Sequence, residues 1–405
     1  MRIAMISEHA TPVPAEGGAA GAQQRHVAEL STALAELGHD VRVYVRRSHP
    51  AQPASVDLPG GVQVVYVPAG PALELPPEAL LPHMGDFAQW LRTEWRDRHW
   101  LPDVAHAHFW TSGLAAVTAA RQVGVPVVQS FHELSGPMLP DAAQPSSGAS
   151  RTGYERALGR AVDRVVAQSQ GELQGLVRIG VPRSRLAVVP AGVDSDRFTP
   201  EGPAVDRDPE RPRILSVGRL VEHKGFGDVI QAMRYLPNAE CVVVGGPSPQ
   251  RLAADPQARK LRELAEKYQV ADRVRLVGAV PATDMPRWYR SADLFVAAGW
   301  REQFDLAPLE AMACGVPIVG AAAGGLNETV VDGLTGELVP ARDPRALGGA
   351  LRRLINDKVR RFSYATAALD RARQAYSWKR VAAQIGSVYS TVSGRRVPEP
   401  EAVAQ

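Results

Sequence analysis

Two basic and two acidic side chains lie where a phosphate or a sugar hydroxyl is commonly bound. Arg219 and Lys224 come after an apolar run and before a helix-like segment, so they are placed to grip a pyrophosphate. Glu302 and Glu310 are separated by seven residues in a second loop-to-helix stretch. Lone charges are more often solvated surface residues, so the interpretation depends on the elements that carry these four.

The stretch REQFDLAPLEAMACGVPIVG predicts a loop, a short helix and a buried strand at Val316 to Gly320. Pro308 suits the first helical turn, because its missing N–H would be unpaired there anyway. Glu310 is expected in the same turn, where an acid complements the positive end of the helix. Gly315 and Pro317 then end the helix.

The start of this short helix is its chemically useful part. Free N–H groups near Leu306 and Ala307 would form an anion site. An ordinary loop–helix–strand unit of an α/β protein explains the same pattern without any ligand.

Length and composition fit a two-domain globular protein. The chain has 405 residues, 45% of them hydrophobic, and a net charge of +3, which argues neither for nor against polyanionic partners. No run of 18 apolar residues is present, and the opening MRIAMIS reads as a strand rather than a signal peptide. Cys241 and Cys314 imply no disulfide framework, so we expect a cytoplasmic protein.

The first half reads as a doubly wound sheet. A strand at Arg2 to Ser7, a Gly/Ala-rich loop, a helix at about Gln23 to Leu37 and a strand at Val41 to Val45 form a βαβ unit. The loop does not match a dinucleotide fingerprint, so a flexible turn is the alternative to a ligand-binding loop. Further strands are expected at Val62 to Val67, Val104 to His108, Val125 to Phe131 and Arg164 to Gln168.

The second half repeats this alternation after a Pro-rich, charged linker at 199–213. We therefore expect a first domain at 1–198, a second at 214–375 and a C-terminal helix at about 376–392. Strands of the second domain are expected at Ile214 to Val217, Glu240 to Val244, Val274 to Val277, Leu294 to Ala297 and Val316 to Val319.

Several polar side chains fall at predicted strand ends, where open α/β sheets place ligands. His106 and His108 are two apart, so they share one face of a strand. Metal binding by this pair is one interpretation, but no third ligand is evident nearby, which favours a packed or substrate-facing role. His132 follows the next strand, with a histidine satisfied by the backbone as the alternative. Segment 137–152 predicts a mobile loop over the cleft in which these strand ends would bind a ligand.

Two further motifs have structural interpretations. The segment GDFAQWLRTEWRDRHW carries Trp90, Trp95 and Trp100 and predicts an amphipathic helix packed on its own domain, with an interfacial membrane helix as the alternative. The DSD run at Asp194 to Asp196 mimics a metal-binding D-x-D motif, but its place before the linker favours a turn.

The run EAMACGVPIV, together with the two spaced glutamates, resembles the signature of retaining GT-B glycosyltransferases of family four. This group contains the glycogen-synthase-like and sucrose-synthase-like enzymes. The run GRLVEHKG resembles the diphosphate clamp of the family, and the likeness covers nearly the whole chain. It implies two doubly wound α/β domains facing a cleft, a C-terminal helix that crosses back to the first domain, and neither a metal nor a cofactor.

The resemblance implies a nucleoside-diphosphate sugar as donor, in the first place a UDP-sugar. Glu310 would bind the ribose, and the backbone around Gly278 to Val280 would hold the base. Arg219 and Lys224 would neutralise the departing diphosphate, while Glu302 holds a sugar hydroxyl. The implied donor set is Gly21, Gly218, Arg219, Lys224, Gly278, Val280, Glu302, Phe304, Asp305, Leu306, Ala307 and Glu310, and the catalytic set is His132, Arg219, Lys224 and Glu302.

Retention of configuration is implied as well, with a phosphate oxygen taking the acceptor proton and no paired-carboxylate glycosidase mechanism. One departure from the family pattern stands beside the sugar pocket. Asp305 follows the Phe of E-x-F, where relatives usually have Gly. Its side chain is expected to alter which donor sugar is accepted.

The first domain resembles the branch that glycosylates inositol phosphates, through the run HAHFWTSG. A Tyr hydroxyl that helps hold the phosphate in that branch is replaced here by Phe109. Glu8 and Glu133 lie at predicted strand ends, where carboxylates would repel a phosphate and attract an ammonium group, unless they pair with loop arginines. We therefore expect an aminocyclitol-type acceptor, as in antibiotic biosynthesis. The expected acceptor contacts are Glu8, Gln24, His108, Phe109 and Glu133.

Other functions are open for the same residues. The acceptor could instead be an inositol phosphate or a lipid-linked molecule, and the reaction could be that of a GT-B epimerase or phosphorylase. A binding module without catalysis is disfavoured by the intact clamp and glutamates. Neither a nucleic-acid partner nor a membrane span is expected.

Overall fold

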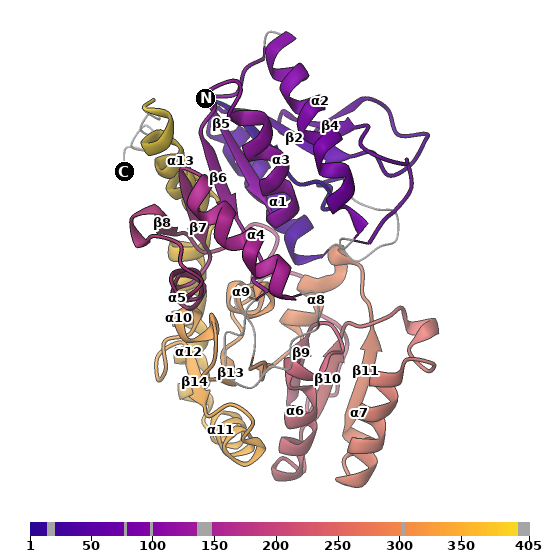
Figure 1. The fold of residues 1–405 in the computed structure, drawn as a ribbon. Coiled ribbons are helices and arrows are strands. Elements are labelled where there is room, and N and C mark those ends of the chain that lie inside the picture. The colour runs from indigo at the N-terminus through magenta and orange to yellow at the C-terminus, as the bar shows by residue number, and fades with distance from the viewer. Residues whose placement is uncertain (14–20, 77–78, 98–99, 136–147, 301–304, 396–405) are drawn as a thin grey trace. The chain divides into compact units, whose positions relative to one another are not determined.

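The computed structural model describes residues 1–13, 21–76, 79–97, 100–135, 148–300 and 305–395 (Figure 1). Two of the predicted donor-site residues, Glu302 and Phe304, lie outside the described residues. Contacts within the chain separate two units: the first consists chiefly of residues up to Ala191 and those from Trp378, and the second of Gly192–Ser377. Each unit is built on one largely parallel sheet, so the predicted pair of doubly wound α/β domains is confirmed.

The first unit holds an eight-stranded sheet in the order β3-β4-β2-β1-β5-β6-β7-β8. All neighbouring strands run parallel except β3, which is antiparallel to β4. The strands are β1 (Arg2–Ile6), β2 (Asp40–Arg46), β3 (Ser55–Leu58), β4 (Val62–Val67), β5 (Val104–His108), β6 (Val127–Ser130), β7 (Arg164–Ala167) and β8 (Leu186–Val188). Ile6 pairs with Ala107, and His108 pairs with Ser130, so the carboxyl ends of β1, β5 and β6 meet at one edge.

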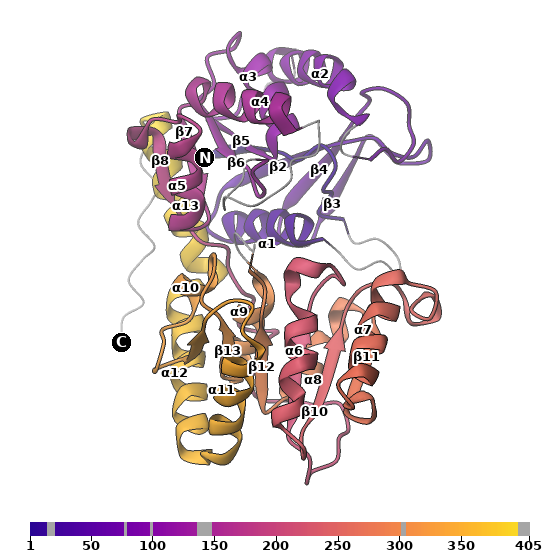
Figure 2. The ribbon, with the colours of Figure 1, turned by 60° about the horizontal axis from the view of Figure 1, so that its bottom comes forward.

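Helices cover both faces of this sheet. α2, α3 and α4 lie on one face, and α1 and α13 lie on the other (Figure 2). Their bounds are α1 (Ala22–Glu36), α2 (Met84–Asp97), α3 (Trp110–Ala120), α4 (Gly148–Ala161), α5 (Gln170–Arg178) and α13 (Trp378–Ser393). The predicted C-terminal helix therefore belongs to the first unit and begins after Ser377, which separates it from α12.

The tryptophan-rich segment packs on its own unit, as predicted. Trp95 in α2 and Trp100 after it are buried in the hydrophobic core, and Trp90 packs against that core. The Trp100 indole also donates to Asp40 Oδ2 at 2.6 Å. With two of these rings inside the core and the third packed against it, the amphipathic helix packs on its own unit as predicted. Across the described ranges, no helix is long and apolar enough to cross a membrane.

The second unit holds a six-stranded parallel sheet in the order β11-β10-β9-β12-β13-β14. Its strands are β9 (Arg213–Val217), β10 (Glu240–Val244), β11 (Val274–Gly278), β12 (Leu294–Ala297), β13 (Ile318–Ala321) and β14 (Gly336–Val339). Its helices are α6 (Phe226–Ala232), α7 (Pro256–Lys267), α8 (Met285–Arg290), α9 (Leu306–Ala313), α10 (Leu326–Thr329), α11 (Pro344–Asn356) and α12 (Lys358–Tyr376). β13 lies two residues later than predicted, and β14 was not predicted.

Alternating side chains divide the core of the second unit between the two faces of its sheet. Ile214 of β9 packs with α6, α7 and α11, while its neighbour Leu215 packs with α8, α9 and α12. Because both faces are covered, the central strands β12 and β13 consist of apolar residues, as is typical of parallel sheets.

The segment predicted as a linker is bonded to the second unit. The Thr199 carbonyl accepts from Arg290 Nε at 2.8 Å, and the Asp206 carbonyl accepts from Arg213 Nη2 at 3.0 Å. Its proline and charge content is typical of a linker, but buried or half-buried guanidinium groups give its carbonyls fixed partners. Just before it, Asp194 Oδ1 accepts from the backbone N–H of Asp196, which confirms the turn predicted for the DSD run.

Candidate active site

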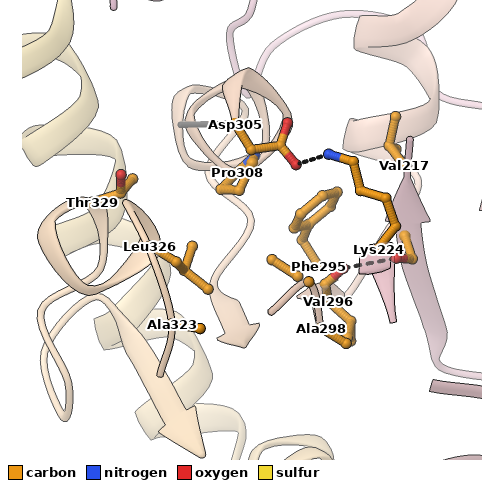
Figure 3. Close-up of a pocket in the computed structure, with 13 residues that line it drawn as sticks. Val217, Lys224, Phe295, Val296, Ala298, Asp305, Pro308, Ala323, Leu326 and Thr329 are labelled. Carbon is orange, nitrogen blue, oxygen red and sulfur yellow. Dashed lines mark hydrogen bonds and ion pairs between the residues drawn. The ribbon is translucent and has the colours of Figure 1, made fainter. Parts of the chain in front are cut away.

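An ion pair joins two loops of the second unit at the carboxyl edge of its sheet. Lys224 ends a short 3₁₀ turn, Glu222–Lys224, that follows β9, and Asp305 precedes α9. The Lys224 Nζ lies 2.8 Å from Asp305 Oδ2 (Figure 3). The pair lines a pocket whose other walls are mostly apolar, including Val217, Phe295 and Leu326. Within this pocket the Lys224 ammonium group is paired with the carboxylate of Asp305.

Two glycines bring backbone close to this edge. Gly218 directly follows β9 with φ +156°, and a Cβ there would lie 3.3 Å from Lys224 Cε. Gly278 ends β11 with φ +87°, and a Cβ there would lie 2.9 Å from the Pro247 carbonyl oxygen. Both conformations favour glycine. Larger residues would displace the loops that carry Lys224 and Val280.

The start of α9 differs from the prediction in two respects. Asp305 is the N-cap and its Oδ1 accepts from Ala307 N–H at 3.2 Å, so the N–H predicted to be free is occupied. Leu306 is the first helical residue, which makes Pro308 the third and Glu310 the fifth. Glu310 therefore lies in the second turn rather than the first, because a side-chain cap ahead of the proline starts the helix earlier.

Glu310 is buried beneath this helix start and is fixed by a tyrosine. Its carboxylate Oε2 accepts from the Tyr289 hydroxyl at 2.6 Å, and only 5% of Glu310 is exposed. Arg219, in contrast, is exposed, and its guanidinium has no hydrogen-bond or ion-pair partner among the described residues. Val280 is half-buried against the α8–α9 side of the core. The predicted donor residues of this unit thus combine one buried acid, one paired lysine and one exposed arginine.

In the first unit, Glu8 follows β1 and is fully occupied by neighbouring groups. Its carboxylate accepts short hydrogen bonds from the hydroxyls of Thr111 and Ser112, and His9 Nδ1 lies 3.0 Å from its Oε1. Only 1% of Glu8 is exposed. The carboxylate therefore fixes the start of α3 to the end of β1.

Histidine rings are stacked at the ends of β5 and β6. The rings of His106 and His108 lie 4.3 Å apart, which confirms that they share a face of β5. His106 bonds to the Tyr389 hydroxyl at 2.7 Å and to Ser130 Oγ at 2.9 Å, whereas His108 Nδ1 lies 2.9 Å from His132 Nε2. The ring of His26, from α1, lies 4.9 Å from that of His132. A third candidate ligand thus exists, contrary to the sequence argument.

Burial keeps these imidazoles neutral. It lowers the pKa of His26 to about 4, and together with the nearby His26 it lowers the pKa of His106 to about 3. The pKa values of His108 and His132 are also well below the usual range, because of burial first and the neighbouring histidines second.

Backbone strain occurs at the two strand ends that carry the predicted acceptor residues. Phe109 has φ +81° and His132 has φ +62°, both in the region that favours glycine. Such outliers concentrate at functional sites. The Arg151 guanidinium lies 4.9 Å above the Phe109 ring, bonds Glu155 through Nε at 2.9 Å and donates to the Glu133 carbonyl at 2.6 Å. The Glu133 side chain itself is exposed.

The two remaining predicted residues lie at the start of α1. Gly21 is its N-cap with φ −63°, and a Cβ there would meet no atom within 4 Å, so nothing described requires glycine. Gln24 donates to the Val13 carbonyl at 3.3 Å.

Comparisons with known proteins match both halves of the chain to glycosyltransferase families. Residues 23–197 match the family model described as Glycosyltransferase Family 4, and residues 201–371 match the model described as Glycosyl transferases group 1. The chain is 36% identical to a D-inositol 3-phosphate glycosyltransferase from Xylanimonas cellulosilytica over 98% of both chains. The chain belongs to the family-four glycosyltransferases. A second relative of this glycosyltransferase, D-inositol 3-phosphate glycosyltransferase 2 from Catenulispora acidiphila, is 34% identical over 96% of this chain and 94% of the relative.

Solved structures place the glycosyltransferase in the GT-B fold. It superposes on a sucrose-phosphate synthase from Thermosynechococcus elongatus with a TM-score of 0.84 and 27% identity, covering 97% of this chain and 99% of that one. The expected family and fold are therefore confirmed.

Sequence reasoning missed several residues around these sites. Tyr289 fixes Glu310, and Gln168 lies 3.3 Å from His26 Nδ1 and 3.4 Å from His132 Nδ1 through its Nε2. Arg151, at the start of α4, was also missed. No local signal marks these partners, since each comes from an element distant in sequence.

Proposed function

We propose that this glycosyltransferase moves a sugar from a nucleoside diphosphate, UDP in the first place, to a phosphorylated cyclitol. The acceptor class is supported by the relatives, since those at 36% and 34% identity are D-inositol 3-phosphate glycosyltransferases. These relatives favour the inositol-phosphate alternative over an aminocyclitol. The reaction is proposed to retain the configuration of the transferred sugar.

The donor is held by the second unit in this proposal. Lys224 and Arg219 neutralise the diphosphate as it leaves, and the buried Glu310 binds the ribose hydroxyls. Preformed positive charge at a developing negative charge is a large contribution to catalysis, because it needs no reorganisation during the reaction. These side chains supply that charge without a metal ion, and a donor phosphate oxygen takes the acceptor proton.

One contact in the first unit supports the proposal of a phosphorylated acceptor. Arg151 lies over the face of Phe109, and its Nε and Nη2 are engaged by Glu155 and the Glu133 carbonyl. Its remaining nitrogen, Nη1, has no partner among the described residues, so it can donate to a phosphate. In this proposal the Arg151 guanidinium binds the phosphate in place of the Tyr hydroxyl that related enzymes have at the position of Phe109.

Of the two carboxylates that would attract an amine-bearing acceptor, Glu8 is not available. Both oxygens of Glu8 are already bonded by Thr111, Ser112 and His9, and the side chain is buried. An ammonium group would have to displace these partners. The exposed Glu133 still favours an aminocyclitol as the second candidate.

Competition between the two acceptors tests this proposal. With one UDP-sugar donor, inositol 3-phosphate and 2-deoxystreptamine are offered at equal concentration, and the products are read by mass. We expect the phosphorylated product to dominate, and Arg151→Gln to raise the KM for the phosphate acceptor about tenfold or more, since a charge-assisted bond is worth about 1.5–3 kcal/mol. Preference for the amine, abolished in Glu133→Gln, would replace this acceptor by the second candidate.

A further inference from the structure

Three histidines in the first unit offer ring nitrogens that converge. His26 comes from α1, His108 ends β5 and His132 follows β6. One nitrogen from each lies within 4.8 Å of the other two, and these three form a group that could hold a metal ion. We call them the histidine cluster. The elements are far apart in sequence, so the convergence is produced by the sheet order and not by a local motif.

The separation of two ring nitrogens is close to that of a metal site. His108 Nδ1 and His132 Nε2 are 2.9 Å apart. Zinc–nitrogen bonds of about 2.0–2.1 Å in a tetrahedron put two ligand nitrogens about 3.3 Å apart. The pair would have to open by only about 0.4 Å. The His26 nitrogen lies within 4.8 Å of the other two, so it would have to move by about 1.5 Å at most, which a side-chain rotation supplies.

Gln168 is placed to orient two of the three rings. Its side-chain amide faces Nδ1 of both His26 and His132, at 3.3 and 3.4 Å. With the amide turned so that its oxygen faces the rings, it accepts from Nδ1–H of each and leaves both Nε2 lone pairs for an ion. Metal-binding histidines commonly have such an acceptor on their second nitrogen.

The hydrogen bonding of His108 is incomplete, in contrast to that of His106. Both nitrogens of His106 are bonded, to Tyr389 and to Ser130, so its ring has a structural role. His108 is fully buried, yet its Nε2 has no hydrogen-bond partner in the described part of the chain. Buried polar atoms without partners are rare and call for an explanation. The Nδ1 of His108 is bonded to His132 within the cluster, so ligation through Nδ1 replaces that bond and leaves Nε2 as it is.

We propose that His26, His108 and His132 bind one divalent transition-metal ion, with Zn²⁺ as the representative. Ligation needs the His132 proton on Nδ1, facing Gln168, and the His108 proton on Nε2, so no net proton is released. Because the rings are neutral near pH 7, protons do not compete with the ion. Three imidazoles leave a fourth position for water. His132 is half-buried, so the ion would enter the cluster from solvent on the side of this residue.

Binding is measured on the whole protein after chelation and desalting. Zn²⁺ uptake is followed by competition with a chromophoric chelator, and Co²⁺ serves as the spectroscopic probe, since its visible absorption is far stronger in a four-coordinate than in a six-coordinate site. We expect one tight ion per chain and the four-coordinate Co²⁺ spectrum. The variant His26→Phe keeps a ring against Trp378 and removes one ligand, and it should bind at least a hundredfold more weakly.

A matched control separates this site from surface binding, since the chain has ten histidines. His49→Gln changes an exposed histidine outside the cluster and should leave both readouts unchanged. If His26→Phe fails to fold, the Co²⁺ spectrum of the unmodified protein decides. A six-coordinate spectrum, no tight ion, or equal binding by a folded His26→Phe variant would each overturn the proposal. None of these readouts depends on sugar transfer, so the proposed function stands or falls separately.

Discussion

Lys224 Nζ and Asp305 Oδ2 are 2.8 Å apart, although the two residues are separated by 81 positions in the sequence. Lys224 belongs to the predicted diphosphate clamp, and Asp305 is the residue that departs from the family pattern. The Asp305 side chain therefore points at the lysine. It also caps α9 through its other oxygen. One carboxylate thus caps the helix and pairs with the lysine, so in the proposed mechanism it would compete with the donor phosphate for Lys224.

Removing the lysine should depress turnover far more than stability. Lys224→Ala loses a charge-assisted contact to the leaving group, which should raise the barrier by about 3 kcal/mol and slow turnover a hundredfold or more. Steady-state kinetics with the unfolding temperature as a check measure this. Lys260→Ala, an exposed lysine on α7, is the matched control. Near-normal turnover in a folded Lys224→Ala protein would exclude the clamp role.

Removing the competing charge should tighten nucleotide binding. Asp305→Asn can still cap α9, because asparagine is a good N-cap, but it no longer pairs with Lys224. Since a partly exposed ion pair is worth about 1 kcal/mol or less, UDP should bind up to about fivefold more tightly. Calorimetric titration gives the dissociation constants. Unchanged or weaker UDP binding would mean that the carboxylate does not compete with the phosphates.

Chelation should leave sugar transfer intact. In the proposed mechanism Lys224 and Arg219 supply the positive charge that a divalent ion provides in other transferases. Turnover measured in excess EDTA should equal that of the untreated protein. Loss of activity that returns with Mg²⁺ or Mn²⁺ would show that the diphosphate needs a metal.

Acid should destabilise the protein between about pH 6.5 and pH 4. The pKa of His26 falls from 6.5 unfolded to about 4 folded, so the unfolded chain binds more protons in this window. His106, His108 and His132 act in the same direction. Burial raises the pKa of Glu172 to about 7 and also raises that of Glu155, and both oppose the histidines over part of the window. The lowered pKa of His39 adds to the loss, whereas the raised pKa values of His9 and Asp228 oppose it. The net effect is a loss, because the four buried histidines have large shifts and only Glu172 does among the opposing groups.

Urea denaturation at pH 7.5 and 5.5 measures this loss. His26 alone should contribute about 1 kcal/mol at pH 5.5. The variant His26→Phe should therefore lose less stability over the same interval than the unmodified protein. An equal loss in both would mean that His26 does not titrate with folding.

Sequence patterns predicted most strands of both sheets, because apolar runs bounded by turn residues are local signals. They placed the start of α9 too late, since the proline rule competed with an N-cap at Asp305 that only the side-chain geometry decides. They also missed β14, a four-residue strand, Gly336–Val339, at a sheet edge.

The histidine cluster could not be predicted in the same way. His108 and His132 were recognised as strand-end residues, but His26 lies on a helix whose packing depends on strand order. Spacing along the chain carries no information about that order. The Arg151–Phe109 contact has the same origin, as it joins α4 to the end of β5.

The last helix of the first unit has a consequence for how the chain folds during synthesis. Trp378 and Tyr389 both lie on α13. His26 packs edge-on against the Trp378 ring, and His106 is hydrogen-bonded to the Tyr389 hydroxyl. The ribosome makes all of Gly192–Ser377 before this helix exists, so the second unit can fold while the first is still incomplete. The histidine rings acquire their final surroundings only when synthesis of α13 is finished.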